Sequence, residues 1–344
     1  SDGSDPNPWE PIPLPMDSEL DQYCGWIDTD EFELNPKDPA DGGSHNHKGF
    51  SVHAVEDTLW VGTAGGINKG VLQPGGCINW RHFNSFGDGI SGNWVIGIAH
   101  QESTDPDGNP YMRIWAITWS TGGNESYGLS YTDDGGYTWH IDDQLTSLNL
   151  RIYGISTSPE KLMVASENGL YISADGNHWE KLNNPIEMGG EQLLTEAYFA
   201  CLLEPDITRT WVGSPDGLAF TDDLGETWDV IRFWNSTSSQ TDETDSFYAY
   251  PNPIYTGSYN RLNGNSYVRF VFDQPGAQEA KLTIFDFSMS KVAALGQPHE
   301  VGGEMEVLWN CRNDWGDPVV NGVYFCRLET DHNTQWTKVV VIND

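Results

Sequence analysis

Short apolar runs that end at a glycine turn recur along the first two thirds of the chain. They cover residues 59–63, 114–118, 162–166 and 211–214, and the turn glycines are Gly66, Gly128, Gly169 and Gly217. Continuous apolar runs of this length, bounded by turn residues, are typical of strands that are buried on both faces. The small residues Gly62, Ala165 and Gly213 near the strand ends would let neighbouring backbones approach closely. The pattern predicts a repeated β-sheet unit.

Each apolar run is followed by a polar turn that ends in tryptophan. Two copies are full length, at 132–139 (TDDGGYTW) and 221–228 (TDDLGETW). The copy at 173–179 (SADGNHW) is one residue shorter, and a fourth near Gly75, Gly76 and Trp80 has lost its aspartate.

The residue types in these turns favour a structural role over a catalytic one. Hydroxyl and carboxylate oxygens can accept bonds from N–H groups inside the turn, and glycine supplies the positive φ. The tryptophan can pack beneath the loop. The expected structural positions are Thr132, Asp134, Gly136, Trp139, Ser173, Asp175, Gly176, Trp179, Thr221, Asp223, Gly225 and Trp228.

These turns resemble the Asp-box (BNR) repeats of β-propellers in sialidases, sortilin-type receptors and photosystem assembly factors. The strand at 59–63 also resembles the propellers of two-component regulators. The turn tryptophans at 80, 139, 179 and 228 are 59, 40 and 49 residues apart, and about 40–50 residues is typical of one four-stranded blade. About four blades are therefore visible, whereas known propellers usually close with about four to eight. Strands from residues 1–50, further repeats of a longer chain or a partner chain could complete the ring.

After a polar linker at 235–247 the pattern changes to strands of alternating polarity. They are expected at 267–272, 280–286, 306–309, 322–328 and 338–342, and this period predicts one β-sandwich over 248–344. The segments YPNP at 250–253, IFD at 284–286, WNCRN at 309–313 and NGVYF at 321–325 resemble the immunoglobulin-like domain of the flagellar hook-capping protein. They are similar also to the C-terminal sorting domains of type IX secretion. The predicted fold is all-β, with propeller blades over 51–234 followed by an immunoglobulin-like β-sandwich.

Residues 1–50 are rich in proline, aspartate and glycine, and four prolines lie between Pro6 and Pro13. Proline removes backbone donors and prevents regular ladders. We expect an arm laid on another surface, a solvated tail or part of a further blade. Within this segment His45, Asn46 and His47 could suggest a metal site, but a solvent-exposed loop is favoured because no third ligand is in view.

The formal net charge of −34 narrows the function classes. Residues 1–247 hold 10 Lys+Arg against 40 Asp+Glu, about −30, and residues 248–344 hold 7 against 11, about −4. Such a surface repels nucleic acid and anionic lipid, so nucleic-acid binding is excluded. A solvated surface tuned for solubility is favoured over a surface for cations or basic partners. No apolar run approaches the roughly 18 residues that a membrane helix needs.

The five cysteines, Cys24, Cys77, Cys201, Cys311 and Cys326, show neither a CxxC pair nor a Cys/His metal spacing. An odd number leaves at least one thiol unpaired within the chain. Cys311 and Cys326 lie in neighbouring predicted strands and could form one disulfide. The chain begins at Ser1 without an export signal, which we interpret as a processed mature chain.

One segment could bind a metal ion. In the insertion at 101–111, Asp105, Asp107 and Asn109 place oxygen atoms at alternate positions around Gly108, a pattern that can hold Ca²⁺. A plain Asp/Asn turn has the same composition, so both interpretations stay open. No other cofactor is expected.

Signals of catalysis are weak. A sialidase needs an arginine cluster and a Tyr/Glu nucleophile pair, and the nine arginines form no such motif. A glycosidase with two carboxylates is not distinguished, because acidic residues abound. The aromatic residues Trp115, Trp119, Phe233 and Trp234 could stack on sugar rings, but core packing is favoured.

The resemblances imply a secreted or cell-surface protein of a bacterium that is not an enzyme. Its propeller would offer loops for protein binding or assembly, and its terminal domain would serve sorting, docking or attachment. Two alternatives stay open, because a fold does not determine a function. One is carbohydrate binding, with an Asp-box glycoside hydrolase as its catalytic extreme, and the other is a structural subunit of an extracellular filament or surface layer.

Overall fold

The computed structural model describes residues 12–25, 32–104, 108–187, 191–204, 209–232, 247–257, 261–273, 280–301, 304–331 and 333–343. Strands account for 51 % of the residues and helices for 4 %, which confirms the predicted all-β class. The helices of these ranges are η1 (Pro39–Asp41), η2 (His45–His47) and α1 (Asp143–Ser147). None of them is long and apolar enough to cross a membrane.

The chain folds into two compact units. The first comprises Ser1–Leu182 and Phe199–Thr210, and the second comprises Asn183–Tyr198 and Trp211–Asp344. Most of the last sequence repeat is therefore grouped with the C-terminal sandwich. The domain limits expected at 50, 234 and 247 stay predictions.

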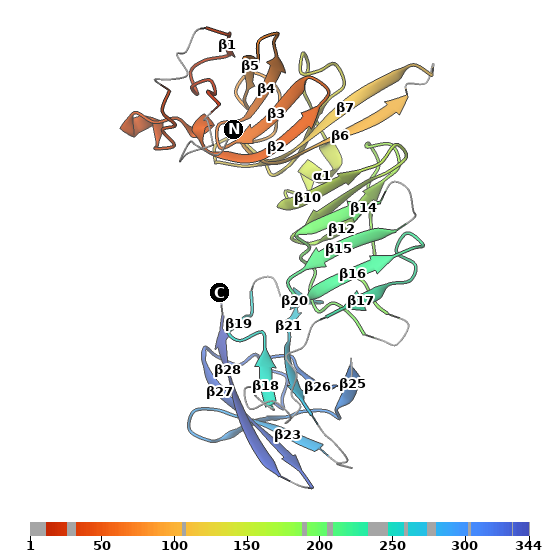
Figure 1. Cartoon of the computed structure of the whole chain (residues 1–344). Helices are drawn as coiled ribbons and strands as arrows, with labels where there is room; N and C mark the ends of the chain where they lie inside the picture. The colour runs from red at the N-terminus through yellow and green to blue at the C-terminus, as the bar shows by residue number, and fades with distance from the viewer. Residues whose placement is uncertain are drawn as a thin grey trace, which may run out of the picture. The chain divides into compact units, whose positions relative to one another are not determined.

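Three antiparallel sheets of the first unit follow one another along the chain (Figure 1). Their strand orders are β1-β5-β4-β3-β2, β6-β7-β8-β9 and β10-β11-β12-β13, so each contains a four-stranded meander. The strands are β1 Asp21–Gln22, β2 Gly49–Val55, β3 Thr58–Thr63, β4 Ile67–Leu72, β5 Ile78–Phe83, β6 Trp94–Thr104, β7 Pro110–Trp119, β8 Gly128–Thr132, β9 His140–Ile141, β10 Ile152–Thr157, β11 Leu162–Ser166, β12 Gly169–Ser173 and β13 Glu180–Lys181.

A fourth sheet has the same meander order, β14-β15-β16-β17. Its strands are β14 Ala200–Leu203, β15 Thr210–Ser214, β16 Gly217–Thr221 and β17 Asp229–Ile231. Four-stranded meanders are the units from which propeller blades are built. The described residues do not show a closed ring of such sheets.

The sequence repeat corresponds to a repeated hydrogen bond at the end of the second strand of each sheet. There a hydroxyl group donates to the carbonyl oxygen of the turn glycine. The pairs are Thr63 with Gly66 at 3.1 Å, Thr118 with Gly128 at 3.2 Å, Ser166 with Gly169 at 2.8 Å and Ser214 with Gly217 at 2.9 Å. One sequence pattern thus produces one local geometry four times.

The close approach expected near the strand ends occurs at Gly62 of β3. A Cβ atom at this position would lie 2.3 Å from the carbonyl oxygen of Val95 in β6. Because that distance is far inside van der Waals contact, only glycine fits where the first two sheets meet.

The described part of the N-terminal arm is bonded to the first sheet of its own chain. Asn46 and the β4 residue Asn68 exchange two amide hydrogen bonds of 2.7 and 2.8 Å, and Asn46 also donates to the carbonyl oxygen of Pro15 at 2.7 Å. Asp17 accepts bonds from the backbone N–H groups of His45 and Asn46 at 2.9 and 2.7 Å. The arm is therefore laid on the sheet by specific polar contacts.

The expectation of a solvent-exposed loop at residues 45–47 is wrong. Asn46 is fully buried and His47 is 8 % exposed, within the short helix η2. The physical reason is the polar network of Asn46 and Asp17. It supplies hydrogen-bond partners to the amide groups of the segment, so the segment can be buried.

The C-terminal part of the second unit is a two-sheet sandwich. The sheet orders are β18-β22-β26-β25 and β19-β28-β27-β23-β24, with a separate hairpin β20-β21. The strands are β18 Phe247–Tyr250, β19 Ile254–Tyr255, β20 Arg261–Leu262, β21 Asn265–Ser266, β22 Val268–Phe272, β23 Ala280–Phe285, β24 Lys291–Ala294, β25 His299–Val301, β26 Glu304–Trp309, β27 Gly322–Thr330 and β28 Thr334–Ile342. The strands expected from the alternating pattern are present.

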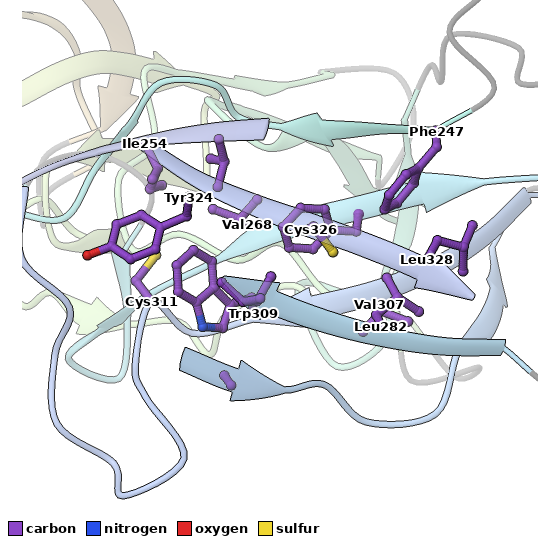
Figure 2. Packing of buried hydrophobic residues seen from close by; sticks show 14 of the residues in the cluster. Phe247, Ile254, Val268, Leu282, Val307, Trp309, Cys311, Tyr324, Cys326 and Leu328 are labelled. Carbon is purple, nitrogen blue, oxygen red and sulfur yellow. The ribbon is translucent and has the colours of Figure 1, made fainter. Parts of the chain in front are cut away.

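Figure 2 shows the core between the two sheets, where Trp309, Val268, Leu282 and Leu328 pack together. Trp309 is 1 % exposed, and its indole N–H donates to the carbonyl oxygen of Arg312 at 2.8 Å. The inward residues alternate with outward ones along β27, which fixes the register of that strand.

The disulfide considered between Cys311 and Cys326 is wrong. Both thiols are free and buried in the sandwich core, and Figure 2 shows them at separate places within it. Cys311 lies in the turn after β26 with φ +55°, whereas Cys326 points inward from the middle of β27. The disulfide of the chain joins Cys24 to Cys77 and ties the arm to the hairpin before β5.

Candidate functional site

The three Asp-box-like turns, at 132–139, 173–179 and 221–228, lie between the third and fourth strands of the second, third and fourth sheets. In the first of them, the Thr132 hydroxyl donates to Asp134 at 2.8 Å and accepts from the N–H of Gly136 at 2.9 Å. The Asp134 carboxylate accepts from the N–H of Thr138 at 2.9 Å. The hydroxyl and the carboxylate thus hold the turn from inside.

The other two turns repeat this arrangement. Ser173 accepts from the N–H of Gly176 at 2.8 Å, and Asp175 accepts from the N–H of His178 at 2.9 Å. In the last turn the corresponding bonds to Thr221 and Asp223 are both 2.9 Å long. In all three turns the Oδ1 atom of the aspartate accepts a backbone N–H group of its own turn.

The bonds inside the turns keep the aspartates ionised. Partial burial works against ionisation, but the bonds from Thr138 and Thr132 lower the pKa of Asp134 to about 2. The Thr227 hydroxyl and N–H lower the pKa of Asp223 to about 2. Acids with such pKa values are poor proton donors at neutral pH, so they are unsuited to general acid catalysis.

The tryptophans of the two turns in the first unit, Trp139 and Trp179, each pack against the preceding sheet. Trp139 lies edge-on to Trp60 of β3, with ring centroids 6.0 Å apart, and 5.7 Å from Phe83. Trp179 lies edge-on to Trp115 of β7 at 6.3 Å. Trp60 and Trp115 occupy equivalent positions, three residues before the strand-end hydroxyl, so successive sheets are joined in the same way.

Two glycines inside these turns, Gly136 and Gly176, make this packing possible. A Cβ atom at Gly136 would lie 2.9 Å from the Phe83 ring, and one at Gly176 would lie 2.6 Å from the Trp115 ring. Both glycines also have positive φ, +93° and +72°. The turn backbone therefore sits directly on an aromatic ring of the sheet before it.

The candidate calcium residues fall mostly outside the described ranges. Asp105 and Asp107 lie outside them. Asn109 is exposed and directly precedes β7. Among the described residues, no group of three or more His, Cys, Asp or Glu side chains is arranged to hold a metal ion. The calcium site stays a prediction.

Of the four aromatic residues considered for stacking on sugar rings, the structure describes Trp115 and Trp119. Trp115 is fully buried in the core between the second and third sheets, and it is not available to a ligand. Trp119 is half-buried and its indole N–H donates to the carbonyl oxygen of Ile152 at 2.8 Å. Phe233 and Trp234 lie outside the described residues.

A buried ionic cluster joins the last repeat to the sandwich within the second unit. Arg269 of β22 binds both oxygens of Asp216, at 2.8 and 3.1 Å, and Glu306 of β26 at 2.5 Å. Arg232, after β17, binds Asp216 at 3.2 Å and also Glu191. Burial raises the pKa of Glu306, although Arg269 works in the opposite direction. Because these charges are paired and largely buried, the cluster acts as a structural contact, or joint, between the last repeat and the sandwich.

The outward face of the larger sandwich sheet carries exposed aromatic side chains. We define the aromatic face as Phe285 of β23, Phe287 in the following turn, Phe325 and Arg327 of β27, and Trp336 of β28. The Arg327 guanidinium lies 5.0 Å from the Phe285 ring and 5.7 Å from the Trp336 ring. The Phe285 and Trp336 rings are 5.6 Å apart, and the Phe287 and Phe325 rings are 6.5 Å apart.

Two members of the aromatic face are exposed, and Phe285, Phe325 and Arg327 are half-buried. Phe287 is 81 % exposed and Trp336 is 46 % exposed. Register places Phe325 opposite Phe285 and Lys338, and Arg327 opposite Trp336, so these side chains share one side of the sheet.

Sequence reasoning missed the aromatic face, although a signal was present. Along β27 the inward residues Tyr324, Cys326 and Leu328 alternate with Phe325 and Arg327. In a strand with one solvated face, the outward positions are expected to be polar. Phe325 at such an outward position was therefore a visible departure from the expected alternation.

Comparisons with known proteins give no family for the chain. No protein-family model and no curated protein matches it. Among solved structures it is similar to PorZ of Porphyromonas gingivalis, described as an essential bacterial surface component of the type-IX secretion system. The identity is 14 %, the match covers 85 % of this chain and 51 % of that one, and the TM-score is 0.29. The chain thus spans about half the length of PorZ, and its function must be argued from its own residues.

Proposed function

We propose that this chain is a non-catalytic, exported or cell-surface protein that binds another protein through the aromatic face. The observation that carries the proposal is the exposure of Phe287 and Trp336 near Arg327 on one side of a sheet. Aromatic residues and arginine are the types most enriched at the centres of protein interfaces.

The energetic scale supports such a role. Covering an aromatic side chain removes on the order of 150–250 Å² from water, which is worth about 2–4 kcal/mol at a well-packed contact. Phe287 is still largely free to contribute this on binding, because 81 % of it is exposed. Two or three such side chains supply enough free energy for specific association.

The charges around the face indicate the chemistry of the partner. Arg327 pairs with Glu329 at 2.8 Å, and Lys338 and Lys281 lie on the same side of the sheet. The fitting partner surface is therefore apolar at its centre with acidic groups at its rim.

The test compares Phe287→Ser with Phe86→Ser in affinity captures from the cells that make the protein. Phe86 is 89 % exposed in the first unit, so it is a matched control with no place on the face. Proteins retained by the wild type and by Phe86→Ser, but lost with Phe287→Ser and Trp336→Ser, are the expected result. Equal retention by all four forms would refute the proposal.

Two further measurements separate the alternatives. The wild-type chain is expected to leave a glycan array blank, and binding to a glycan that Trp336→Ser abolishes would replace the protein partner by a carbohydrate. Protease treatment of intact cells is expected to digest the chain, since it is proposed to be outside; full protection would contradict export.

A further inference from the structure

A pocket of about 210 Å³ lies in the first unit, between strands β1, β5 and β4 of the first sheet and the Asp-box-like turn of the second sheet. Its lining includes Lys69 of β4, Arg81 of β5, Asp21 of β1 and the ring of Tyr137. Tyr137 is 83 % exposed at the rim. The pocket is distinct from the aromatic face, which belongs to the second unit.

Comparing the repeats shows that the two cations are peculiar to the first sheet. Three residues after the turn glycine, the first sheet has Lys69, whereas the later sheets have Tyr131, Ile172 and Phe220. Across the sheet, Lys69 pairs with Arg81, and the later partners are His140, Glu180 and Asp229. The first sheet therefore has two adjacent cations where each later sheet has an aromatic or aliphatic residue paired with His140, Glu180 or Asp229.

The next sheet shows how the chain neutralises a cation at a comparable place. Arg113 lies 4.3 Å from the Tyr131 ring and binds both oxygens of Asp133, at 2.5 and 2.9 Å. Register makes Thr58 and Val71 the counterparts of Arg113 and Asp133 in the first sheet. The position of the neutralising carboxylate is thus occupied by valine.

The cations of the pocket have no such partner within the described part of the chain. Lys69 donates to the carbonyl oxygen of Gly135 at 2.7 Å, and Arg81 lies 5.4 Å from the Phe83 ring. No carboxylate of the described residues forms an ion pair with either, in a chain with 51 acidic and 17 basic residues. Burial and then the charge of Arg81 lower the pKa of Lys69, and the charges of Asp57 and Asp134 oppose this shift without reversing it. An incoming anion would offset the remaining cost of the buried charge.

We infer that this pocket binds a side-chain carboxylate of an acidic polypeptide segment. Lys69 and Arg81 take the carboxylate, as Arg113 takes Asp133, and Tyr137 covers the segment from the rim. A polypeptide is favoured because the equivalent place in the next sheet already holds an aspartate side chain packed beside aromatic rings.

The negative charge of the whole chain does not prevent this. At about 0.15 M salt, charges more than roughly 8 Å apart are largely screened, so the two cations at contact distance dominate. Asp21 leaves the lining with a net charge of about +1 from these three groups.

The test is calorimetric titration of the full chain at 150 mM NaCl with N-acetyl-tetraglutamate amide. The neutral probe is N-acetyl-tetraglutamine amide, and the sugar probe is sodium glucuronate. We expect binding of the tetraglutamate probe alone. Equal binding of the tetraglutamine probe, or no binding of tetraglutamate, overturns the inference; tighter binding of glucuronate overturns the polypeptide assignment.

Variants locate the binding. Arg81→Gln is expected to weaken tetraglutamate binding about tenfold, as the loss of one charge-assisted bond predicts. Lys181→Gln, on the fourth strand of the third sheet, is the control and is expected to leave it unchanged. Val71→Asp supplies an internal carboxylate and is expected to abolish binding while the chain stays folded by circular dichroism. Unchanged affinity in Arg81→Gln and Val71→Asp overturns the inference.

Discussion

Replacing Gly176 by alanine tests the way in which successive sheets of the first unit are joined. Gly176 has φ +72°, and an added Cβ atom would lie 2.6 Å from the ring of Trp115. Trp115 is fully buried, so its ring has little room to move away. The variant therefore carries both a backbone strain and a packing clash.

The two costs can be separated with a matched glycine. Gly123 has φ +66° in the same unit, and nothing lies within 4 Å of an added Cβ atom. Gly123→Ala is expected to lower the free energy of unfolding only by the cost of the left-handed backbone, about 1–2 kcal/mol. Gly176→Ala is expected to lower the free energy of unfolding by about 1–3 kcal/mol more, which is the usual cost of overpacking a core.

The assay is urea unfolding of the full chain, followed by tryptophan fluorescence, for the wild type and both variants. The predicted result is a larger fall in the free energy of unfolding for Gly176→Ala than for Gly123→Ala. Equal losses in the two variants would refute the packing of the turn at 173–179 on Trp115.

Three further predictions concern the charged and cysteine residues. The pKa of Asp134 is lowered from 3.8 to about 2, so its contribution to stability is present above pH 4 and lost as pH falls to about 2; the stability gap between the wild type and Asp134→Asn should close over that window in acid unfolding. Reducing the disulfide between Cys24 and Cys77, whose sequence separation is 53, is expected to cost up to about 4 kcal/mol through the freed loop, measured as a lower urea midpoint with dithiothreitol; an unchanged midpoint would contradict it. Arg269→Met leaves buried carboxylates, including Glu306, without their cation, and should cost about 3–5 kcal/mol; a loss below about 1 kcal/mol would show that the cluster does not act as a joint.

Much of the strand pattern could be predicted from the sequence because it depends on local chemistry. The Thr132 and Asp134 turn is satisfied by its own backbone, so a short motif suffices to anticipate its bonds. The alternating strands of the sandwich likewise follow from a period of two. The number of sheets needed for a closed ring depends on packing at a distance and could not be predicted.

The misjudged segments depend on partners that are far apart in sequence. Asn46 is buried because Asn68 and Pro15 meet it, at separations that composition does not reveal. The pairing of Cys24 with Cys77 depends on the arm lying beside β5, through two residue pairs with β1. The pocket around Lys69 emerged only when register placed it against Arg81.

The proposed protein-binding face is tested most directly by a photo-crosslinking amino acid placed at the position of Trp336. In living source cells, illumination is predicted to join the chain to one discrete protein at this position and not at Phe86. The absence of an adduct at 336, or the same adducts at both positions, would contradict the account.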